Sequence, residues 1–308
     1  MTRAALPLGV DVGTARTRVA HAVLDATGAP ALVAVATRPT GDDPAGAIAA
    51  ARAELRTRER RCVLALTAPD AVLRTVTFPA MNARERMRAA RYEIARVADF
   101  AADAAVRVVA TQRERYVVGA ARRTALDARA GAARRAGLRP IAVDDTAFAL
   151  LRAFPDAGAV VDVGDTSTVL CIRREPIPTV HIAGGGGAAL TAALSTALAI
   201  DTASAEERKR TIGLGGAADH ARDALVDALA SALVAHRAAC AEDVASVVLT
   251  GNGARLRGLA TAVERAIAIP VRVGTLEAAA HAAYPDDVVR AASPDWALAY
   301  GLALWSAA

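Results

Sequence analysis

Lysine and cysteine are nearly absent from this 308-residue chain, and aromatic side chains are scarce. All but one of its 37 basic residues are arginine, and the exception is Lys209. The three cysteines, Cys62, Cys171 and Cys240, lie far apart, which excludes a CxxC metal or redox pair and a disulfide framework. With 3% aromatic residues, the chain also lacks the stacking surface typical of single-strand nucleic-acid binding. We therefore expect no structural zinc, no disulfide and no nucleic-acid partner.

Long hydrophobic runs are also missing, although 54% of the residues are hydrophobic. Stretches such as residues 188–200 are interrupted by Thr and Ser and fall short of the roughly 20 apolar residues that cross a bilayer. The first apolar run ends at Asp11 without the cleavage pattern of a secretory signal. The length suits about two globular domains with a large core. The expected location is the cytoplasm.

The net charge of +5 is concentrated in one segment. Residues 81–137 contain 13 arginines and six acidic residues, a net +7, whereas the rest of the chain sums to −2. A solvated surface on an arginine-rich protein accounts for this concentration. This is the favoured interpretation, and the alternative is a surface that faces anionic lipid headgroups or an acidic partner. Both interpretations stay open.

One short pattern occurs twice. The string VDVGTART begins at Val10, and VDVGDTST begins 151 residues later at Val161. In each copy an apolar strand leads to Asp-x-Gly, where the glycine lets backbone N–H groups approach an anionic ligand closely. Two such turns facing each other would bind phosphates, and Asp11 and Asp162 would hold a hydrated Mg²⁺. The repeat predicts two related domains with a phosphate site between them.

Hydrophobic periodicity predicts α/β layers in both halves of the chain. In the first half we expect strands at 6–12, 17–24, 31–36, 62–66, 72–78 and 139–143, and helices at 44–55 and 146–154. Between them lies a small α/β insert, with a helix at 83–97, strands at 105–111 and 115–119, and a helix that ends at Gly137. In the second half we expect strands at 159–163, 168–173, 179–183 and 246–249, the last leading through Gly251-Asn252-Gly253 into a helix.

The order of these motifs resembles the actin-like ATPase superfamily, which includes actin, DnaK-type chaperones, sugar kinases and FtsA. Within it the chain is most similar to the PilM family of type IV pilus assembly proteins, with the cytoplasmic domains of type II secretion GspL proteins as relatives. The strings that carry this resemblance cover most of the chain: LGVDVGTARTRVA, TFPAMNARERMRAARYEIA, AGLRPIAVDDTAFALLRAF, HIAGGGGAALTAALSTALAI, SAEERKR, VVLTGNGARLRGL and WALAYGLAL.

The resemblance implies an α/β fold of the actin-like two-domain type, with duplicated ribonuclease H-like cores and a small FtsA-like inserted subdomain. It also implies the following domain boundaries: 1–80 for the N-terminal part of the first domain, 81–137 for a partner-binding insert, 138–158 for the rest of the first domain, 159–291 for the second domain, and 292–308 for a C-terminal helix that returns to the first domain.

The resemblance also implies an ATP site with Mg²⁺, in which Asp11 and Asp162 hold the metal through water. The residues implied for the two phosphate loops are Asp11, Gly13, Thr14, Arg18, Asp162, Gly164, Thr166, Gly184, Gly185 and Gly186. Those implied for the adenosine side are Glu206, Lys209, Gly251, Gly253 and Arg255.

Three positions depart from the family pattern. Arg18 stands where lysine is frequent, and Asn252 interrupts a pair of glycines. Asp144 stands where related hydrolases place a water-positioning Gln or Glu, and its side chain is shorter than that of Glu. We therefore expect at most slow ATPase activity, with Asp144 as the catalytic candidate.

The family implies a cytoplasmic scaffold at the inner face of the inner membrane that docks the cytoplasmic N-terminal tail of a PilN-like protein. We expect Arg84, Arg88 and Arg91 of the insert at the partner surface. The alternatives are a small-molecule kinase or other phosphotransferase, a GspL-like secretion protein, and a relative that self-associates into filaments. The insert at 81–137 and the absence of a cysteine-rich zinc signature argue against the kinase.

Overall fold

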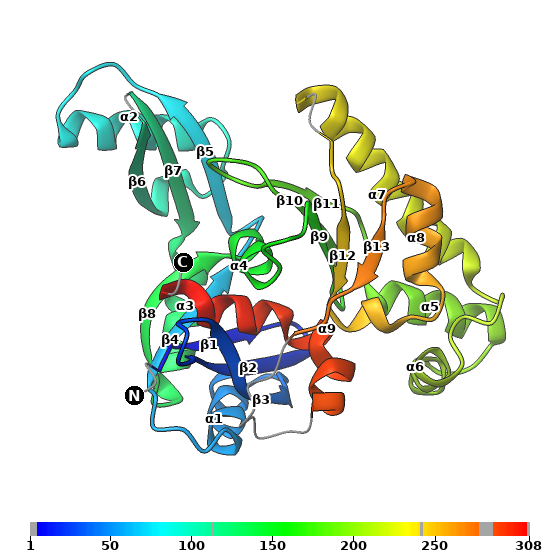
Figure 1. The fold of residues 1–308 in the computed structure, drawn as a ribbon. Helices are drawn as coiled ribbons and strands as arrows, with labels where there is room; N and C mark the ends of the chain where they lie inside the picture. The colour runs from blue at the N-terminus through cyan, green and yellow to red at the C-terminus, as the bar shows by residue number, and fades with distance from the viewer. Residues whose placement is uncertain (1–4, 113, 241–242, 277–285, 307–308) are drawn as a thin grey trace.

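The computed structural model describes residues 5–112, 114–240, 243–276 and 286–306. These residues form two five-stranded sheets and one three-stranded sheet, with helices on their faces (Figure 1).

The first five-stranded sheet has the strand order β3-β2-β1-β4-β8. Its strands are β1 (Leu8–Val12), β2 (Arg16–Leu24), β3 (Pro30–Pro39), β4 (Arg61–Leu66) and β8 (Arg139–Asp145). β1 runs antiparallel to β2 and parallel to β4, and β4 runs parallel to β8. On the outer face, side chains of β1 pack against two helices, α1 (Pro44–Glu54) and α3 (Arg123–Arg135).

The second sheet repeats this arrangement, in the order β11-β10-β9-β12-β13. Its strands are β9 (Ala159–Val163), β10 (Thr168–Ile172), β11 (Thr179–Ile182), β12 (Val247–Thr250) and β13 (Val271–Val273). β9 pairs antiparallel with β10 and parallel with β12, as β1 pairs with β2 and β4. The equal order and directions confirm the duplication that the repeated sequence predicts.

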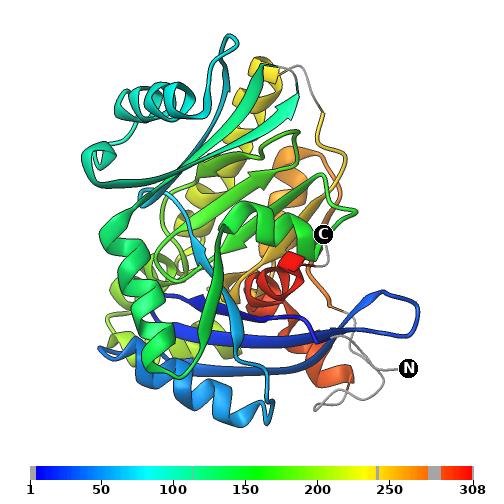
Figure 2. The ribbon, with the colours of Figure 1, turned by 90° about the vertical axis from the view of Figure 1, so that its left-hand side faces the viewer.

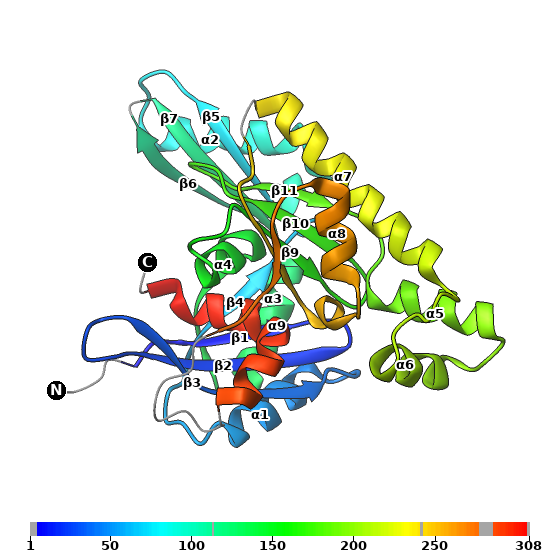
Figure 3. The same ribbon diagram turned by 45° about the vertical axis from the view of Figure 1, so that its right-hand side comes forward.

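Four helices belong to the second sheet, and Figure 3 shows them on its outer side. They are α5 (Gly187–Leu198), α6 (Thr202–Thr211), α7 (Asp219–Cys240) and α8 (Leu259–Ile267). A short 3-10 turn, η2 (Asn252–Arg255), separates β12 from α8. Leucines and valines of this sheet, such as Leu170 and Leu249, form one buried cluster with Leu194 of α5 and Leu229 of α7.

Two helices fill the space between the two sheets. They are α4 (Thr146–Ala153) and α9 (Asp286–Ala303), the latter followed by the 3-10 turn η3 (Leu304–Ser306). Leu150 of α4 and Ala299 of α9 share one buried cluster with Ala20 of the first sheet and Val160 of the second. The core between the domains is therefore continuous, and the C-terminal helix packs against the first domain.

The three-stranded sheet belongs to the inserted subdomain and has the order β5-β7-β6. Its strands are β5 (Ala71–Thr77), β6 (Ala104–Gln112) and β7 (Arg115–Arg122), covered by α2 (Ala83–Ala95) and the turn η1 (Ala101–Asp103). Asn82 begins α2 with a capping box, in which its side chain accepts from the N–H of Glu85 while the Glu85 side chain accepts from the N–H of Asn82.

The inserted subdomain differs from the expected range 81–137. β5 precedes that range but pairs antiparallel with β7 along its whole length, from Ala71 opposite Ala121 to Thr77 opposite Arg115. In contrast, α3 lies inside the range but packs its buried alanines against the first sheet. Packing thus assigns 71–122 to the insert. Residues 277–285 of the expected second domain lie outside the described residues.

Among the described residues, no single helix has both the length and the apolar character to cross a membrane. The consecutive helices α5 and α6 pass that test only as a pair, and they are bent by 107° at the break between them.

Candidate functional site

The two copies of the repeated sequence form the same turn. The amide of Gly13 donates to the carbonyl of Arg16 at 3.1 Å, and the amide of Gly164 donates to the carbonyl of Ser167 at 3.0 Å. A Cβ on either glycine would lie 3.0 Å from the carbonyl oxygen to which its amide donates. Glycine is therefore favoured at this position in each copy, for the same steric reason.

The two turns face each other where the two domains meet, and the space between them is called the cleft below. The hydroxyl oxygen of Thr14, in the first turn, lies 3.5 Å from a carboxylate oxygen of Asp165, in the second. Thr14 and Thr166 are both exposed at the tips of their turns. Behind the first turn, the hydroxyl of Thr40 donates to the Gly13 carbonyl at 2.8 Å. The tertiary structure thus brings the two predicted phosphate loops together.

Asp11 and Asp162 lie next to these turns, one from each domain. Burial, with a smaller contribution from the negative charge of Asp11, raises the pKa of Asp162 to about 6. Burial also raises the pKa of Asp11, although the charges of Arg18 and Arg129 oppose this. Two half-buried carboxylates, of which the charge of Asp11 raises the pKa of Asp162, form a site where a divalent cation would be stabilised.

Arg18 pairs with Asp11 rather than extending freely into the cleft. Its guanidinium lies 3.3 Å from the Asp11 carboxylate and 3.5 Å from the Arg16 carbonyl. A second arginine, Arg129 of α3, donates to the carbonyl of Val12. Sequence analysis did not identify Arg129, because 117 residues separate it from its acceptor.

The glycines before α5 place the start of that helix against the second turn. Gly184, Gly185 and Gly186 precede the helix, whose first amide, of Gly187, donates to the Gly164 carbonyl at 2.8 Å. The next amide of the helix, of Ala188, donates to the Asp165 carbonyl at 2.8 Å, so these first N–H groups are paired within the chain. The helix contributes the positive end of its dipole beside the second turn, which favours an anion such as phosphate.

Gly251 and Gly253 bring the end of β12 against β9. Gly251 has a positive φ of 77°, and a Cβ there would lie 2.5 Å from the Val163 carbonyl and 2.6 Å from the Asp162 carboxylate. A Cβ on Gly253 would lie 2.3 Å from the Val163 side chain. The hydroxyl of Thr250, which sequence analysis also missed, donates to the Asp162 carboxylate at 3.2 Å.

Lys209 connects α6 to the start of α5. Its ammonium donates to the carbonyl of Gly187 at 2.9 Å and to the hydroxyl of Thr191 at 2.6 Å. It also pairs with Glu206 at 2.6 Å, and the Glu206 carboxylate accepts from Thr191 at 2.5 Å. Only 12% of the Lys209 side-chain surface is exposed. The single lysine of the chain thus has partners from two helices.

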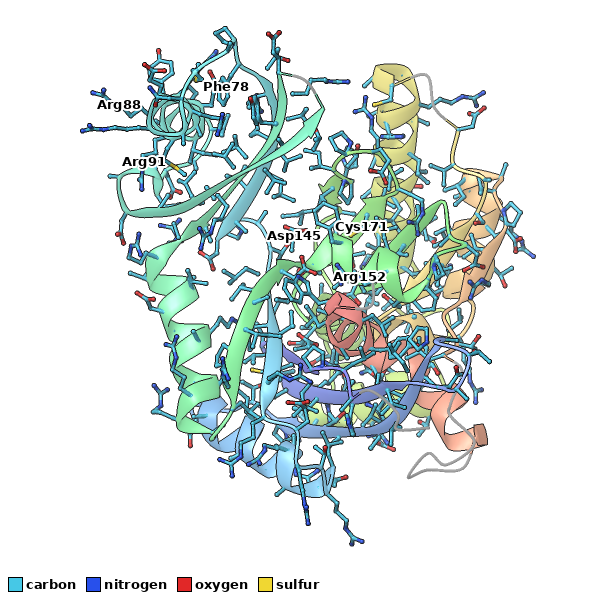
Figure 4. The ribbon with its side chains drawn as sticks, turned by 60° about the vertical axis from the view of Figure 1, so that its left-hand side comes forward. Phe78, Arg88, Arg91, Asp145, Arg152 and Cys171 are labelled. Carbon is cyan, nitrogen blue, oxygen red and sulfur yellow. The ribbon has the colours of Figure 1, made fainter. Side chains whose placement is uncertain are left out.

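Two further predicted residues have partners within the chain. Arg255 pairs with Asp295 of α9 at 3.4 Å, and burial raises the pKa of that carboxyl group. Asp144 pairs with Arg152 of α4 at 2.9 Å, and the same arginine donates to the Gly301 carbonyl. In Figure 4 Arg152 lies between the two domains, close to Asp145.

The predicted partner-binding arginines lie apart from the cleft. Arg84, Arg88 and Arg91 are exposed on α2, and Figure 4 shows Arg88 and Arg91 extending away from the body of the protein. No group of three or more His, Cys, Asp or Glu side chains within the described part of the chain could hold a metal ion. A cation in the cleft would therefore need oxygen atoms from water or ligand besides the two carboxylates.

Solved structures define the class of this fold. The chain aligns over 98% of its length with 98% of a chain in the PilM–PilN type IV pilus biogenesis complex, with 26% identity and a TM-score of 0.84. It is also similar to the ethanolamine utilization protein EutJ from Carboxydothermus hydrogenoformans, at 17% identity and a TM-score of 0.58 over 97% of this chain and 89% of EutJ. The third similar structure is the MamK double helical filament, at 12% identity and a TM-score of 0.54 over 98% of both chains. The fold is that of the actin-like ATPases.

The family follows from the sequence match. A family model described as type IV pilus assembly protein PilM matches residues 41–307. The chain therefore belongs to the PilM family of type IV pilus assembly proteins. A search of curated proteins gave no sequence match.

Proposed function

We propose that this PilM-family protein is a nucleotide-binding scaffold that binds Mg-ATP between its two domains. The observation that carries this proposal is the pair of equivalent turns at Gly13 and Gly164, with the half-buried carboxylates Asp11 and Asp162 beside them. The backbone of the two turns suits phosphates, and the positive end of the α5 dipole lies beside the second turn. The carboxylates suit Mg²⁺, which prefers oxygen ligands and retains much of its water.

The residues of the cleft fit this ligand in two parts. Asp11 and Asp162 would hold Mg²⁺ through water, while the phosphates would occupy the space between the turns, near Thr14, Thr166 and the glycines 184–186. The adenosine part would lie on the side of the second domain, near Glu206, Lys209, Gly251, Gly253 and Arg255. Mg²⁺ supplies positive charge that relieves the repulsion between the two half-buried carboxylates.

Hydrolysis is expected to be slow. The carboxylate of Asp144, the catalytic candidate, is paired with Arg152 at 2.9 Å and also accepts from the N–H of Asp145 at 2.9 Å. A carboxylate held in this way is poorly placed to orient a water molecule. We propose that ATP serves a structural or regulatory role, with at most slow turnover.

Thermal unfolding with Mg-ATP tests the nucleotide site. A ligand that binds only the folded state stabilises it by RT ln(1 + [L]/Kd), about 2.7 kcal/mol at a hundred-fold excess over Kd. We expect the melting temperature to rise by several degrees, and Asp11→Ala and Asp162→Ala to reduce this rise. Asp227→Ala, a change at an exposed aspartate in the same domain as Asp162, is the matched control. The proposal is refuted if millimolar Mg-ATP leaves the melting temperature of the wild type unchanged and calorimetry detects no heat of binding.

We further propose that the insert and the adjoining first domain dock the cytoplasmic tail of a PilN-like inner-membrane protein. The similar structure is of a PilM–PilN complex, which supports a partner of this kind. Three large apolar side chains of the insert are exposed, those of Tyr92, Val97 and Val109. Such side chains offer contacts for the apolar anchors of an extended tail.

The charge of the insert supports a position at the cytoplasmic face of the inner membrane. Three acidic residues of the insert, Glu93, Asp99 and Asp103, are paired with arginines, at 3.5, 3.0 and 3.2 Å. Arg84, Arg88 and Arg91 have no ion pair among the described residues. Unneutralised arginines on an exposed helix favour peripheral contact with anionic lipids.

Crosslinking tests the docking proposal. A synthetic tail of a PilN-like protein that carries a photoreactive group is expected to attach within residues 71–122 or the adjoining first domain, whereas a scrambled peptide is expected not to attach. Attachment confined to residues 160–276 would show that the insert does not form the docking surface.

A further inference from the structure

Arg129 reaches the first phosphate turn from the outer face of the first sheet. It lies on α3, and its guanidinium donates to the carbonyl of Val12, the last residue of β1. Val12 stands between Asp11 and Gly13. The hydrogen bond to its carbonyl therefore holds the backbone segment that carries both of these residues. The positive charge of Arg129 also interacts favourably with the Asp11 carboxylate.

The helix that carries Arg129 is fixed at both ends. At its start, Arg122 pairs with Asp99 of the insert and with Asp70 just before it, both at 3.0 Å, and its guanidinium lies over the ring of Phe100. Further along, Ala132 and Ala133 are buried against the first sheet. Figure 2 shows α3 running from the inserted sheet along the first domain. Arg129 therefore connects α3, a helix that begins at the end of the insert, to the nucleotide cleft.

We propose that Arg129 is a positioning residue of the nucleotide site, which holds the end of β1 in the geometry that places Asp11 and the Gly13 turn for Mg-ATP. This inference rests on the proposed function. The hydrogen bond from a charged guanidinium to a backbone carbonyl resists displacement more strongly than a neutral one. Any displacement of the inserted sheet that moves α3 would reach the cleft through this contact.

Calorimetric titration with Mg-ATP tests this role in three variants of the full chain. Arg129→Met keeps the aliphatic stem but removes the donor, and we expect it to weaken ATP binding about ten-fold. Arg129→Lys retains a charged donor and is expected to recover most of the affinity. Arg134→Met, an exposed arginine on the same helix, is the control and is expected to bind like the wild type.

A variant that lowers stability but keeps the contact between Arg129 and Val12 distinguishes a positioning role of Arg129 from a general effect on folding. Ala132→Gly weakens the packing of α3 without touching Val12, and it is expected to lower the melting temperature while leaving ATP affinity within two-fold of the wild type. Should Arg129→Met fail to fold, Arg129→Gln, a neutral donor, is measured in its place, with an expected loss of about three-fold.

The outcomes distinguish this inference from the proposed function. A wild type that does not bind Mg-ATP overturns both. A wild type that binds, with Arg129→Met equal to Arg134→Met, overturns only the role of Arg129. The role of Arg129 is also overturned if Arg129→Lys or Ala132→Gly loses as much ATP affinity as Arg129→Met, because the effect would then come from destabilised packing.

Discussion

The hydroxyl oxygen of Thr14 and a carboxylate oxygen of Asp165 lie 3.5 Å apart, although 151 residues separate them in the chain. Each residue directly follows the glycine of its own repeated turn. The contact therefore joins the tips of the two copies and makes the cleft between the domains a single site. It also places a negative charge where the phosphates of a nucleotide would lie.

Removal of that charge should improve nucleotide binding. Asp165→Asn keeps an acceptor for Thr14 but removes the repulsion between a carboxylate and the phosphates. Because Asp165 is exposed, solvent screens much of this repulsion, and we expect an affinity gain of about two- to three-fold. Calorimetry at low and high salt measures the gain, which should shrink as salt increases. Weaker binding in Asp165→Asn would instead indicate that its charge helps to hold the metal.

Loss of Lys209 should affect both stability and nucleotide binding. Its ammonium connects α6 to the carbonyl of Gly187 and the hydroxyl of Thr191, so Lys209→Ala removes two charge-assisted contacts. Such contacts contribute about 1.5–3 kcal/mol each. We expect a lower melting temperature without nucleotide and an ATP affinity reduced ten-fold or more. Arg210→Ala, an exposed neighbour on α6, is the control. Unchanged affinity in a destabilised Lys209→Ala would assign this lysine to the packing of α5 and α6 alone.

Stability should depend on the ionisation of Asp145, the residue that begins α4. Its carboxylate accepts from the N–H of Ala147 at 2.8 Å, and burial, with a smaller contribution from Asp144, raises its pKa to about 6. The folded state holds the carboxyl proton of Asp145 more tightly than the unfolded chain does, so protonation of Asp145 stabilises the fold. This contribution to the free energy of unfolding is complete below about pH 4 and is lost as the pH rises through about 6.

The neutral variant Asp145→Asn tests this dependence. It keeps the acceptor for Ala147 and removes the buried charge, so the protein should gain stability above pH 7, by at most about 3 kcal/mol for a shift of about two pKa units. Its melting temperature should also vary less between pH 4 and 7. Asp145→Ala, which loses the cap, is expected to cost about 1 kcal/mol relative to Asp145→Asn. A lower melting temperature of Asp145→Asn at pH 8 would contradict the assigned ionisation.

Charge reversal on α2 should weaken membrane contact and slow partner association. The variant with Arg84, Arg88 and Arg91 changed to Glu is expected to lose cosedimentation with vesicles that contain anionic lipid. It should also bind the tail of a PilN-like protein with a lower association rate, since charges at a rim act on the rate more than on the final affinity. ATP binding should not change, because these residues lie apart from the cleft.

A charge-matched variant completes that experiment. It reverses three exposed arginines of the second domain instead: Arg210, Arg237 and Arg265. Retained vesicle binding in this control assigns the effect to α2. Equal loss in both variants would show that net charge alone, rather than the surface of α2, governs the contact.

Much of the fold can be predicted from the sequence because its signals are local. Runs such as Ala159–Val163 have the apolar composition of buried strands, and the structure places strands there. The repeat at Val10 and Val161 indicated the duplication, since the same turn favours glycine for the same steric reason in both copies. The predicted helix after Asn82 also begins where its capping residues indicate.

The boundaries of the insert could not be predicted in this way. Whether β5 belongs to the first domain or to the insert depends on its pairing with β7, which lies some forty residues further along the chain. Whether α3 belongs to the insert depends on which surface receives its buried alanines. Such choices concern contacts between distant segments, and local patterns do not encode them.

The sequence by itself therefore determined the duplicated halves, the two glycine turns and the two aspartates that accompany them. Only the tertiary structure decided that these turns face each other, that Arg18 and Arg129 act on the end of β1, and that Lys209 connects two helices. The physical reason is that strand and turn formation depends on neighbouring residues, whereas the electrostatics of a cleft depend on distances between residues more than a hundred positions apart.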